Sequence, residues 1–161
     1  MIPESLLAEA ATLLAACRAR GWMLATAESC TGGLIAAALT AIPGASDVVD
    51  RGFVTYSNDA KMELLGVPEA MLAAHGAVSE AVVRAMAEGA LARSRATISV
   101  SVTGLAGPGG GSAEKPVGLV WFGLAQRGRD LRSERVVFAG DRSTVRSAAV
   151  GHAFGMIRER L

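Results

Sequence analysis

The order of hydrophobic and polar positions along the chain divides it into two kinds of segment. Some segments have the apolar spacing of a helix, whereas shorter runs are continuously apolar or alternating and rich in residues that favour strands. The predicted helices span residues 3–20, 31–44, 58–67, 78–94 and 141–161. The predicted strands span residues 22–29, 47–57, 97–104, 116–128 and 132–140. Helices and strands therefore alternate along most of the chain.

The ends of these segments carry recognisable start and stop signals. Pro3 and Glu4 stand in the first turn of the first helix, and Gly21 ends it. Ser79 and Asp141 are the predicted caps of the last two helices. The last two strands are joined by a short turn, which predicts an antiparallel hairpin. Together the elements predict a three-layer α/β/α fold with a mixed, mostly parallel sheet of about five strands.

Length and composition predict a single domain covering residues 1–161, because no repeat, linker or low-complexity segment is present. Sixteen Lys and Arg residues against fifteen Asp and Glu give a net charge of +1, so we expect no nucleic-acid partner. Hydrophobic residues make up 51% and the mean hydropathy is +0.37, but no apolar run reaches the roughly 20 residues of a membrane span. The apolar character predicts a sheet covered on both faces and a homo-oligomer, with a dimer favoured.

Cysteine usage and the charges of the N-terminal segment bear on the compartment. Cys17 and Cys30 do not make a disulfide framework, and no CxxC motif is present. The first segment carries acids near its start and basic residues near its end, the reverse of a secretory signal. We therefore expect a cytoplasmic protein.

Small polar residues and glycines gather in three segments that directly follow predicted strands. These segments are ESCTGG at 28–33, TYSNDAK at 55–61 and VTGLAGPGGGSAEKPVG at 102–118. Ligands of open α/β sheets bind outside the carboxyl ends of the strands. The three loops are therefore the candidate site.

The first loop places hydroxyl groups beside the start of a helix, where an anion or a developing oxyanion is stabilised. Ser29 is a candidate nucleophile at this position. A structural interpretation is also open, in which Ser29 or Thr31 caps the helix and Gly32 and Gly33 allow close packing. The GxSxG motif of α/β-hydrolases is absent, because Ala27 and Thr31 stand where glycines are required.

A serine nucleophile needs a base, and the two histidines are poor candidates. His152 lies among apolar residues of the last helix, and His75 stands in a connection between helices. Lys61 is the other candidate, because burial lowers the pKa of an amine toward neutrality. Tyr56 would lie close enough to hold the amine or relay a proton. A solvated lysine and a tyrosine at a sheet end are the ordinary alternative.

The glycine-rich third loop is neither a Walker A motif nor a dinucleotide fingerprint, because no GK[ST] follows and a strand stands where a helix is required. Its backbone can approach a ligand closely, with Thr103 adding a hydroxyl, or it simply joins two strands. At the start of the last helix, Arg142 and Arg146 lie four positions apart and would clamp a phosphate. Arginines on such a helix usually face solvent.

Four motifs, AESCTGG, YSNDAKMELLGV, HGAVSE and VTGLAGPGGGSAEKPVG, in this order resemble the C-terminal domain of the competence/damage-inducible CinA family. The resemblance covers nearly the whole chain. It implies a nicotinamide-nucleotide amidohydrolase of the pyridine nucleotide cycle, in a stand-alone form without the N-terminal molybdopterin-binding-like domain of larger CinA proteins. Such an enzyme hydrolyses the carboxamide of nicotinamide mononucleotide to nicotinate mononucleotide and ammonia.

The resemblance also implies roles for individual residues. Ser29 becomes the nucleophile, Lys61 its base and Tyr56 an assisting hydroxyl, in an acyl transfer that needs no metal and no cofactor. The backbone of residues 31–33 or 103–107 would hold the oxyanion. We expect the nucleotide substrate to be bound by Glu28, Thr31, Gly32, Gly33, Asn58, Thr103, Gly104, Gly107, Arg142 and Arg146.

Two functions of other classes remain open. A non-catalytic nucleotide-binding or regulatory module of competence or the DNA-damage response would use the loops to hold a ligand, with Ser29 as a helix cap. A cysteine amidase would use Cys30 with His75, although nothing in the sequence brings these two residues together.

Overall fold

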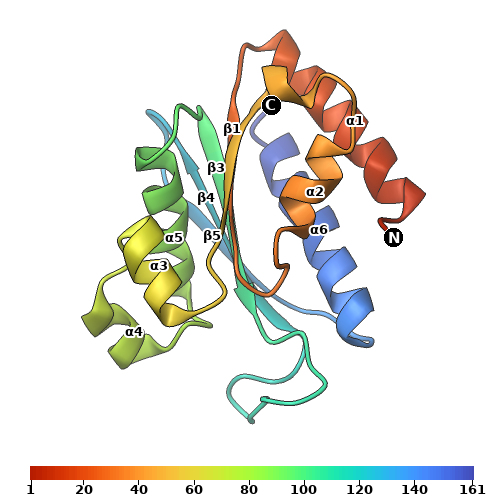
Figure 1. The fold of residues 1–161 in the computed structure, drawn as a ribbon. Helices are drawn as coiled ribbons and strands as arrows, with labels where there is room; N and C mark the ends of the chain where they lie inside the picture. Colours follow the sequence, from red (N-terminus) through yellow and green to blue (C-terminus); the bar gives the residue numbers. More distant parts are fainter.

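A computed structural model describes residues 1–161 as three layers, with a sheet between two groups of helices (Figure 1). The sheet has five strands in the order β2-β1-β3-β4-β5. The strands are β1 (Leu24–Glu28), β2 (Val49–Val54), β3 (Ile98–Gly104), β4 (Leu119–Gln126) and β5 (Arg132–Val137). β1 pairs in parallel with β2 and β3, whereas β4 is antiparallel to β3 and β5. The predicted mixed sheet is confirmed, with β4 alone running against the other strands.

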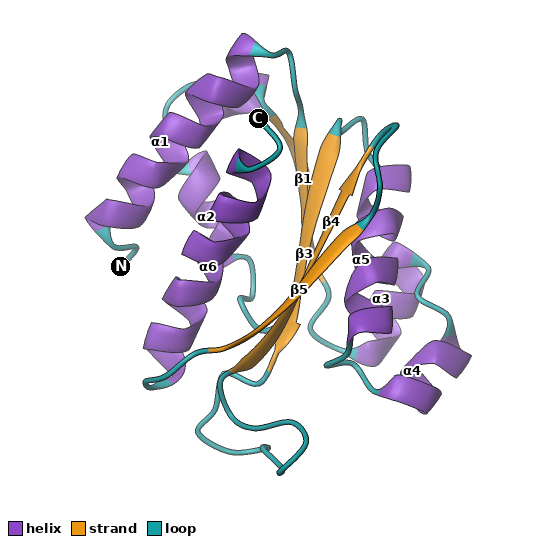
Figure 2. Ribbon diagram, turned by 180° about the vertical axis from the view of Figure 1, so that it is seen from behind, coloured by secondary structure: helices purple, strands orange, loops and turns teal.

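Helices cover both faces of this sheet (Figure 2). One face carries α1 (Glu4–Ala19), α2 (Leu34–Thr40) and α6 (Arg142–Arg158), and the other carries α3 (Asn58–Leu65), α4 (Glu69–His75) and α5 (Glu80–Ala92). The larger hydrophobic core lies between the sheet and α1, α2 and α6, and a smaller one joins β1 to α3, α4 and α5. None of the helices combines the length and the apolar character that crossing a bilayer would require.

Side-chain caps fix the starts of three helices around the site. The Ser57 hydroxyl accepts a hydrogen bond from a backbone N–H in the first turn of α3, and Ser79 does the same for α5. The Asp141 carboxylate accepts the N–H of Thr144 at the start of α6. The caps predicted at Ser79 and Asp141 are confirmed.

Two elements differ from the pattern-based prediction. The segment taken as a connection around His75 is the seven-residue helix α4, which is too short for a helical period to be recognised in the sequence. The predicted second strand at 47–57 is shorter at both ends. A 3₁₀ turn at Ala45–Asp47 precedes β2, and residues 55–57 leave the sheet to reach the start of α3.

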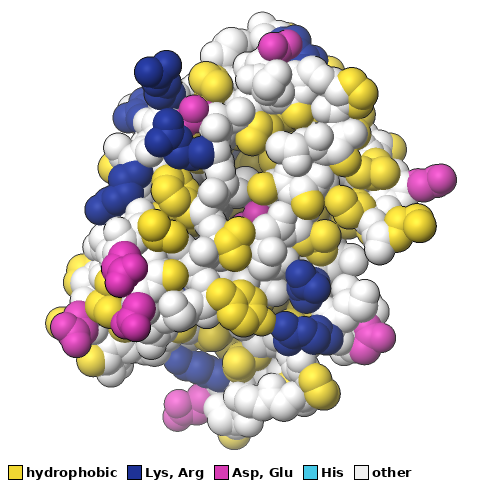
Figure 3. All heavy atoms as spheres, in the orientation of Figure 1, with side chains coloured by type: hydrophobic (Ala, Val, Ile, Leu, Met, Phe, Trp, Pro, Cys, Tyr) yellow, Lys and Arg dark blue, Asp and Glu magenta, His cyan; other side chains and the backbone are white.

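The parallel strands bring the three loops of interest together. Because β1, β2 and β3 are parallel neighbours, their carboxyl ends lie at one edge of the sheet. The glycine-rich segment 105–118 projects from this same edge, at the bottom of Figure 1 and of the space-filling view in Figure 3. The loops that follow these strands therefore converge, as the sequence predicts.

Candidate active site

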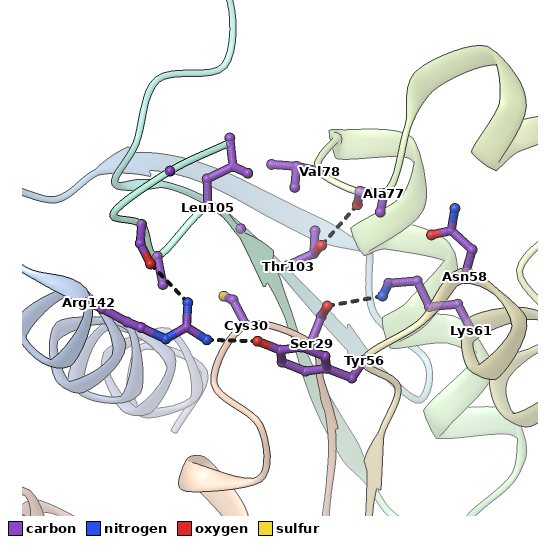
Figure 4. A pocket seen from close by; sticks show the side chains of 14 residues that line it. Ser29, Cys30, Tyr56, Asn58, Lys61, Ala77, Val78, Thr103, Leu105 and Arg142 are labelled. Carbon is purple, nitrogen blue, oxygen red and sulfur yellow. Dashed lines mark hydrogen bonds between the residues drawn. The ribbon is translucent and has the colours of Figure 1, made fainter. Parts of the chain in front are cut away.

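A pocket of about 240 Å³ opens where the three loops converge (Figure 4). Its 14 lining residues are Ser29, Cys30, Tyr56, Asn58, Lys61, Ala77, Val78, Thr103, Gly104, Leu105, Ala106, Gly107, Gly109 and Arg142. Lys61 and Arg142 are its charged residues, and no carboxylate lines it. No group of three or more His, Cys, Asp or Glu side chains in the chain is placed to hold a metal ion. The pocket therefore suits a neutral or anionic ligand.

Ser29 and Lys61 lie side by side in this pocket. The Lys61 Nζ atom is 3.0 Å from the Ser29 hydroxyl oxygen and 2.6 Å from the carbonyl oxygen of Thr55. Ser29 directly follows β1, and α3 carries Lys61 back toward it from the end of the neighbouring strand β2. A neutral amine can donate a hydrogen to the Thr55 carbonyl while accepting one from the serine hydroxyl. This is the contact that a nucleophile and its general base require.

Burial shifts the protonation equilibrium of Lys61 toward the free amine. Its side chain is 1% exposed, and it forms no ion pair with a carboxylate. Desolvation lowers the pKa of Lys61 from its ordinary value of 10.5, because a buried ammonium group loses the water that stabilises its charge. Burial therefore makes the free amine, the form that can accept a proton, more accessible than it is in a solvated lysine.

Glu28 does the capping that the structural interpretation assigned to Ser29 or Thr31. Its fully buried carboxylate accepts hydrogen bonds from the backbone N–H groups of Ile35, at 2.8 Å, and Ala36, at 3.0 Å. The N-cap residue of α2 has no side-chain cap of its own. The interpretation of Ser29 as a helix cap is therefore wrong. Glu28, expected from the sequence to bind substrate, does not line the pocket.

The two arginines at the start of α6 reach different parts of the site. Arg142 lines the pocket and donates to the Tyr56 hydroxyl at 2.8 Å and to the Gly107 carbonyl at 3.0 Å. Arg146, one turn later, does not line the pocket and donates instead to backbone carbonyls of the loop that follows β1. The pair expected to clamp a phosphate is therefore split, and Arg142 alone faces the ligand space.

Tyr56 contacts Arg142 and makes no hydrogen bond with Ser29 or Lys61. Its side chain is 60% exposed, and its ring lies below Ser29 in Figure 4 with the hydroxyl turned toward Arg142. The Lys61 amine is held by the Thr55 carbonyl, and no feature of the sequence pattern identifies such a backbone contact.

The remaining residues expected to bind substrate fall into two groups. Those that line the pocket are Asn58, Thr103, Gly104 and Gly107, and those that do not line it are Thr31, Gly32 and Gly33. The Thr103 hydroxyl donates to the Ala77 carbonyl at 2.9 Å and thereby ties two walls of the pocket together. The Asn58 side chain faces the pocket at the start of α3 (Figure 4).

Cys30 lines the pocket, but its surroundings oppose thiolate chemistry. Burial raises the pKa of the Cys30 thiol to about 11. His75 is exposed at the end of α4 and does not line the pocket, and its backbone carbonyl accepts a hydrogen bond from Lys115. A cysteine amidase built on Cys30 would therefore have no histidine beside the thiol.

Sequence reasoning missed one wall of the pocket. Ala77 and Val78 line it from the turn between α4 and α5. They belong to the HGAVSE motif, whose small residues are the sequence feature that could have indicated a pocket wall. Because helix α4 was not predicted, the position of this turn could not be predicted either.

Comparisons with known proteins agree on one family. The sequence model of the CinA C-terminal domain family matches residues 7–161. Nicotinamide-nucleotide amidohydrolase PncC of Escherichia coli K12 is 54% identical over 138 residues, which cover 86% of this chain and 84% of that protein. The crystal structure of the competence/damage inducible protein CihA from Agrobacterium tumefaciens shares 48% identity and a TM-score of 0.96, covering 99% of this chain and 97% of that one.

Other relatives are longer than this chain. A CinA-like protein of Akkermansia muciniphila is 60% identical over 122 residues, which cover 76% of this chain but 30% of that protein. The chain thus spans about a third of the length of the longer curated relatives it matches.

Proposed function

Because the chain belongs to the CinA C-terminal domain family, we propose that it is a nicotinamide-nucleotide amidohydrolase. It would hydrolyse the carboxamide of nicotinamide mononucleotide, releasing ammonia and nicotinate mononucleotide. The observation that carries this proposal is the 3.0 Å contact between the Ser29 hydroxyl and the buried amine of Lys61. The names of the amidohydrolase relatives supply the substrate, and the contact supplies a chemical route to it.

The acylation half of the reaction begins with the free amine of Lys61. This amine takes the hydroxyl proton of Ser29 while Oγ attacks the carboxamide carbon, and the carbonyl oxygen becomes an oxyanion. The Lys61 ammonium then gives its proton to the departing nitrogen. The C–N bond breaks, ammonia leaves, and an ester links Ser29 to the nicotinate group.

Water completes the reaction by reversing these roles. Lys61 accepts a proton from a water molecule that attacks the ester carbon, and then returns a proton to Ser29 Oγ as the ester bond breaks. Nicotinate mononucleotide leaves and the enzyme regains its starting protonation. One lysine therefore serves both half-reactions.

Backbone N–H groups at the pocket are the proposed donors to the oxyanion. Cys30, Ala106 and Gly107 line the pocket, and their N–H groups donate to no backbone carbonyl. Residues 31–33 do not line the pocket, and the Gly32 N–H already donates to the Ser29 carbonyl, so this segment is the weaker of the two proposed sources. Preorganised donors of this kind lower the barrier because the developing charge needs no reorganisation around it.

The phosphate of the nucleotide would be bound by Arg142. Its guanidinium lies at the pocket between Tyr56 and the Gly107 carbonyl, and it has no carboxylate partner. A planar guanidinium matches phosphate oxygens well. The Asn58 side chain at the pocket is a further proposed donor or acceptor for the substrate.

The test is ammonia release from nicotinamide mononucleotide by the wild type and by Ser29→Ala and Lys61→Ala, measured with EDTA present. We expect rapid release that both substitutions abolish while nucleotide binding persists. Lys115→Arg is the matched control, because Lys115 is the other lysine of the chain and does not line the pocket. Ammonia release that persists in Ser29→Ala would show that Ser29 is not the nucleophile.

A regulatory nucleotide-binding module is the competing function of another class. It predicts that the wild type binds the nucleotide without releasing ammonia and that Ser29→Ala leaves the affinity unchanged. Two observations favour the enzyme. Ser29 is not needed as a cap, because Glu28 caps α2. Burying a lysine without a carboxylate partner costs free energy of folding, and such lysines are typical of functional sites.

A further inference from the structure

We infer that Arg146 is a positioning residue for the nucleophile, and that it acts on the backbone of the Ser29 turn without touching the substrate. The inference rests on the proposed role of Ser29 as the nucleophile. It differs from the expectation that Arg146 binds phosphate, because the guanidinium is directed at main-chain carbonyls and lies outside the pocket lining.

The turn that carries Ser29 leaves one carbonyl group, that of Cys30, without a backbone donor. The Gly32 N–H donates to the Ser29 carbonyl at 2.9 Å, which closes a tight turn. Of the carbonyls of the two residues in between, that of Thr31 accepts the Leu34 N–H at 3.1 Å and that of Cys30 accepts no backbone N–H. Arg146 donates to both, from Nε to Cys30 at 3.2 Å and from Nη2 to Thr31 at 2.8 Å. One guanidinium therefore fixes the orientation of two successive peptide groups directly after the nucleophile.

The position demands an arginine in particular. A planar guanidinium presents several N–H donors in a rigid fork, whereas a lysine ammonium would hold one carbonyl well and the other poorly. Arg146 is in no ion pair, so its charge is directed at carbonyl dipoles. A Cβ atom on Gly32 would lie 3.4 Å from Arg146 Nη2, and Gly32 has a φ of +59°. The turn and the arginine are therefore fitted closely to each other.

The opposite side of the same turn is held by Glu28. Its carboxylate accepts the N–H groups of Ile35 and Ala36 at the start of α2. The Ser29 N–H donates to the Val102 carbonyl of β3 at 2.9 Å. The entry of the turn is thus fixed to the sheet and its exit to Glu28, and in its middle Arg146 is the donor that holds the Cys30 carbonyl.

The consequence for the reaction is geometric. Ser29 Oγ must stay within hydrogen-bond reach of the Lys61 amine, and a misplacement of about 1 Å can cost on the order of 100-fold in rate. Loss of a positioning contact that leaves the binding groups intact lowers kcat and leaves KM nearly unchanged. We expect Arg146→Lys to lower kcat by about 10- to 100-fold.

The experiment uses two readouts of Ser29 in the wild type, Arg146→Lys and Arg146→Ala. The first is kcat and KM for nicotinamide mononucleotide. The second is the rate at which a small uncharged fluorophosphonate labels Ser29, forming an O–P bond and releasing fluoride. Arg158→Ala, in the last turn of the same helix, is the control, because Arg158 is exposed and paired only with Glu9 at 3.9 Å. Thermal unfolding checks that each variant is folded.

Positioning predicts that both Arg146 variants lose kcat and labelling rate together, that KM stays within about twofold, and that added guanidinium ion partly restores Arg146→Ala. Arg158→Ala should behave as wild type. If Arg146→Lys raised KM for the nucleotide while labelling stayed at the wild-type rate, Arg146 would be a phosphate ligand and the inference would fail. Wild-type kcat and labelling in Arg146→Lys would overturn it as well.

The same readouts separate this inference from the proposed function. A wild type that is labelled at Ser29 but releases no ammonia would show that nicotinamide mononucleotide is not the substrate. Slower labelling of Arg146→Lys would still support the positioning role of Arg146. A wild type that is neither labelled nor active would contradict both the proposed function and the positioning role of Arg146.

Discussion

The amine nitrogen of Lys61 lies 3.0 Å from the hydroxyl oxygen of Ser29, across 32 positions of sequence. The contact follows from the pairing of two parallel strands. β1 ends one residue before Ser29, and its neighbour β2 leads into α3, whose fourth residue is Lys61. Because α3 begins at the same edge of the sheet, the buried amine is directed at the hydroxyl. The sheet topology thus places the two side chains in contact.

The pH dependence of turnover follows from the lowered pKa of Lys61. Desolvation moves this pKa below 10.5, and only the free amine can accept the serine proton. Activity should therefore be low where Lys61 is protonated, rise with pH through the lowered pKa, and level off above it. The measurement is kcat/KM for ammonia release across the range in which the wild type stays folded.

The control for this profile is Lys61→Arg. A guanidinium stays protonated at every pH at which the protein is folded, so the variant should be inactive throughout. A wild-type profile that falls as pH rises through the neutral range would contradict a lysine base.

Cys30 should be dispensable for turnover although it lines the pocket. Burial raises its pKa to about 11, so the thiol is protonated near neutrality and is a poor nucleophile. We expect Cys30→Ala to keep most of the wild-type kcat and His75→Ala to behave as wild type. Loss of ammonia release in Cys30→Ala, with Ser29→Ala still active, would instead favour the cysteine amidase.

Much of the fold was predictable because its signals are local. β3 occupies Ile98–Gly104 within the predicted span 97–104, since a run of β-branched residues ends there at a glycine. α6 begins where Asp141 predicts a cap. Helix α4 was not predictable, because seven residues with Leu72 as their buried position carry no period. The dimer expected from the apolar composition stays a prediction.

The candidate site was predictable in its chemical groups and less so in its contacts. Ser29 and Lys61 could be named because hydroxyl, amine and glycine residues follow strands at one edge of a sheet. The contacts of Arg146 join residues 115 and 116 positions apart and end on backbone carbonyls, which leave no trace in composition or spacing. For the same reason the capping role of Glu28 and the Thr55 carbonyl that holds the amine were not foreseen.

Arg142 should distinguish nucleotides from nucleosides. It is the cation at the pocket apart from Lys61, and its guanidinium is tied only to the Tyr56 hydroxyl and a carbonyl. Removing one hydrogen-bonded charge costs about 1.5–3 kcal/mol, which is about 10- to 150-fold in affinity. We expect Arg142→Ala to raise KM for nicotinamide mononucleotide by that factor and to leave kcat/KM for nicotinamide riboside nearly unchanged. An equal loss for both substrates would argue against a phosphate contact.

Gly89 should control the position of Lys61 from the neighbouring helix. A Cβ atom on Gly89 of α5 would lie 2.1 Å from the backbone carbonyl oxygen of Leu65, at the end of the helix that carries Lys61. Backbone cannot yield as a flexible side chain can, so Gly89→Ala must push α3 away from α5. Such overpacking costs about 1–3 kcal/mol of unfolding free energy, and the moved amine should also lower kcat.

Gly155→Ala is the matched control for this substitution. Gly155 lies inside α6, where a Cβ atom would meet nothing closer than 3.8 Å. Alanine favours a helix over glycine by about 1 kcal/mol, so this variant should be as stable as the wild type or more so, with unchanged kcat. Denaturant unfolding and ammonia release measured on both variants test the pair. If Gly89→Ala unfolded at the wild-type denaturant concentration with full activity, close packing of α3 on α5 would not be what holds Lys61 against Ser29.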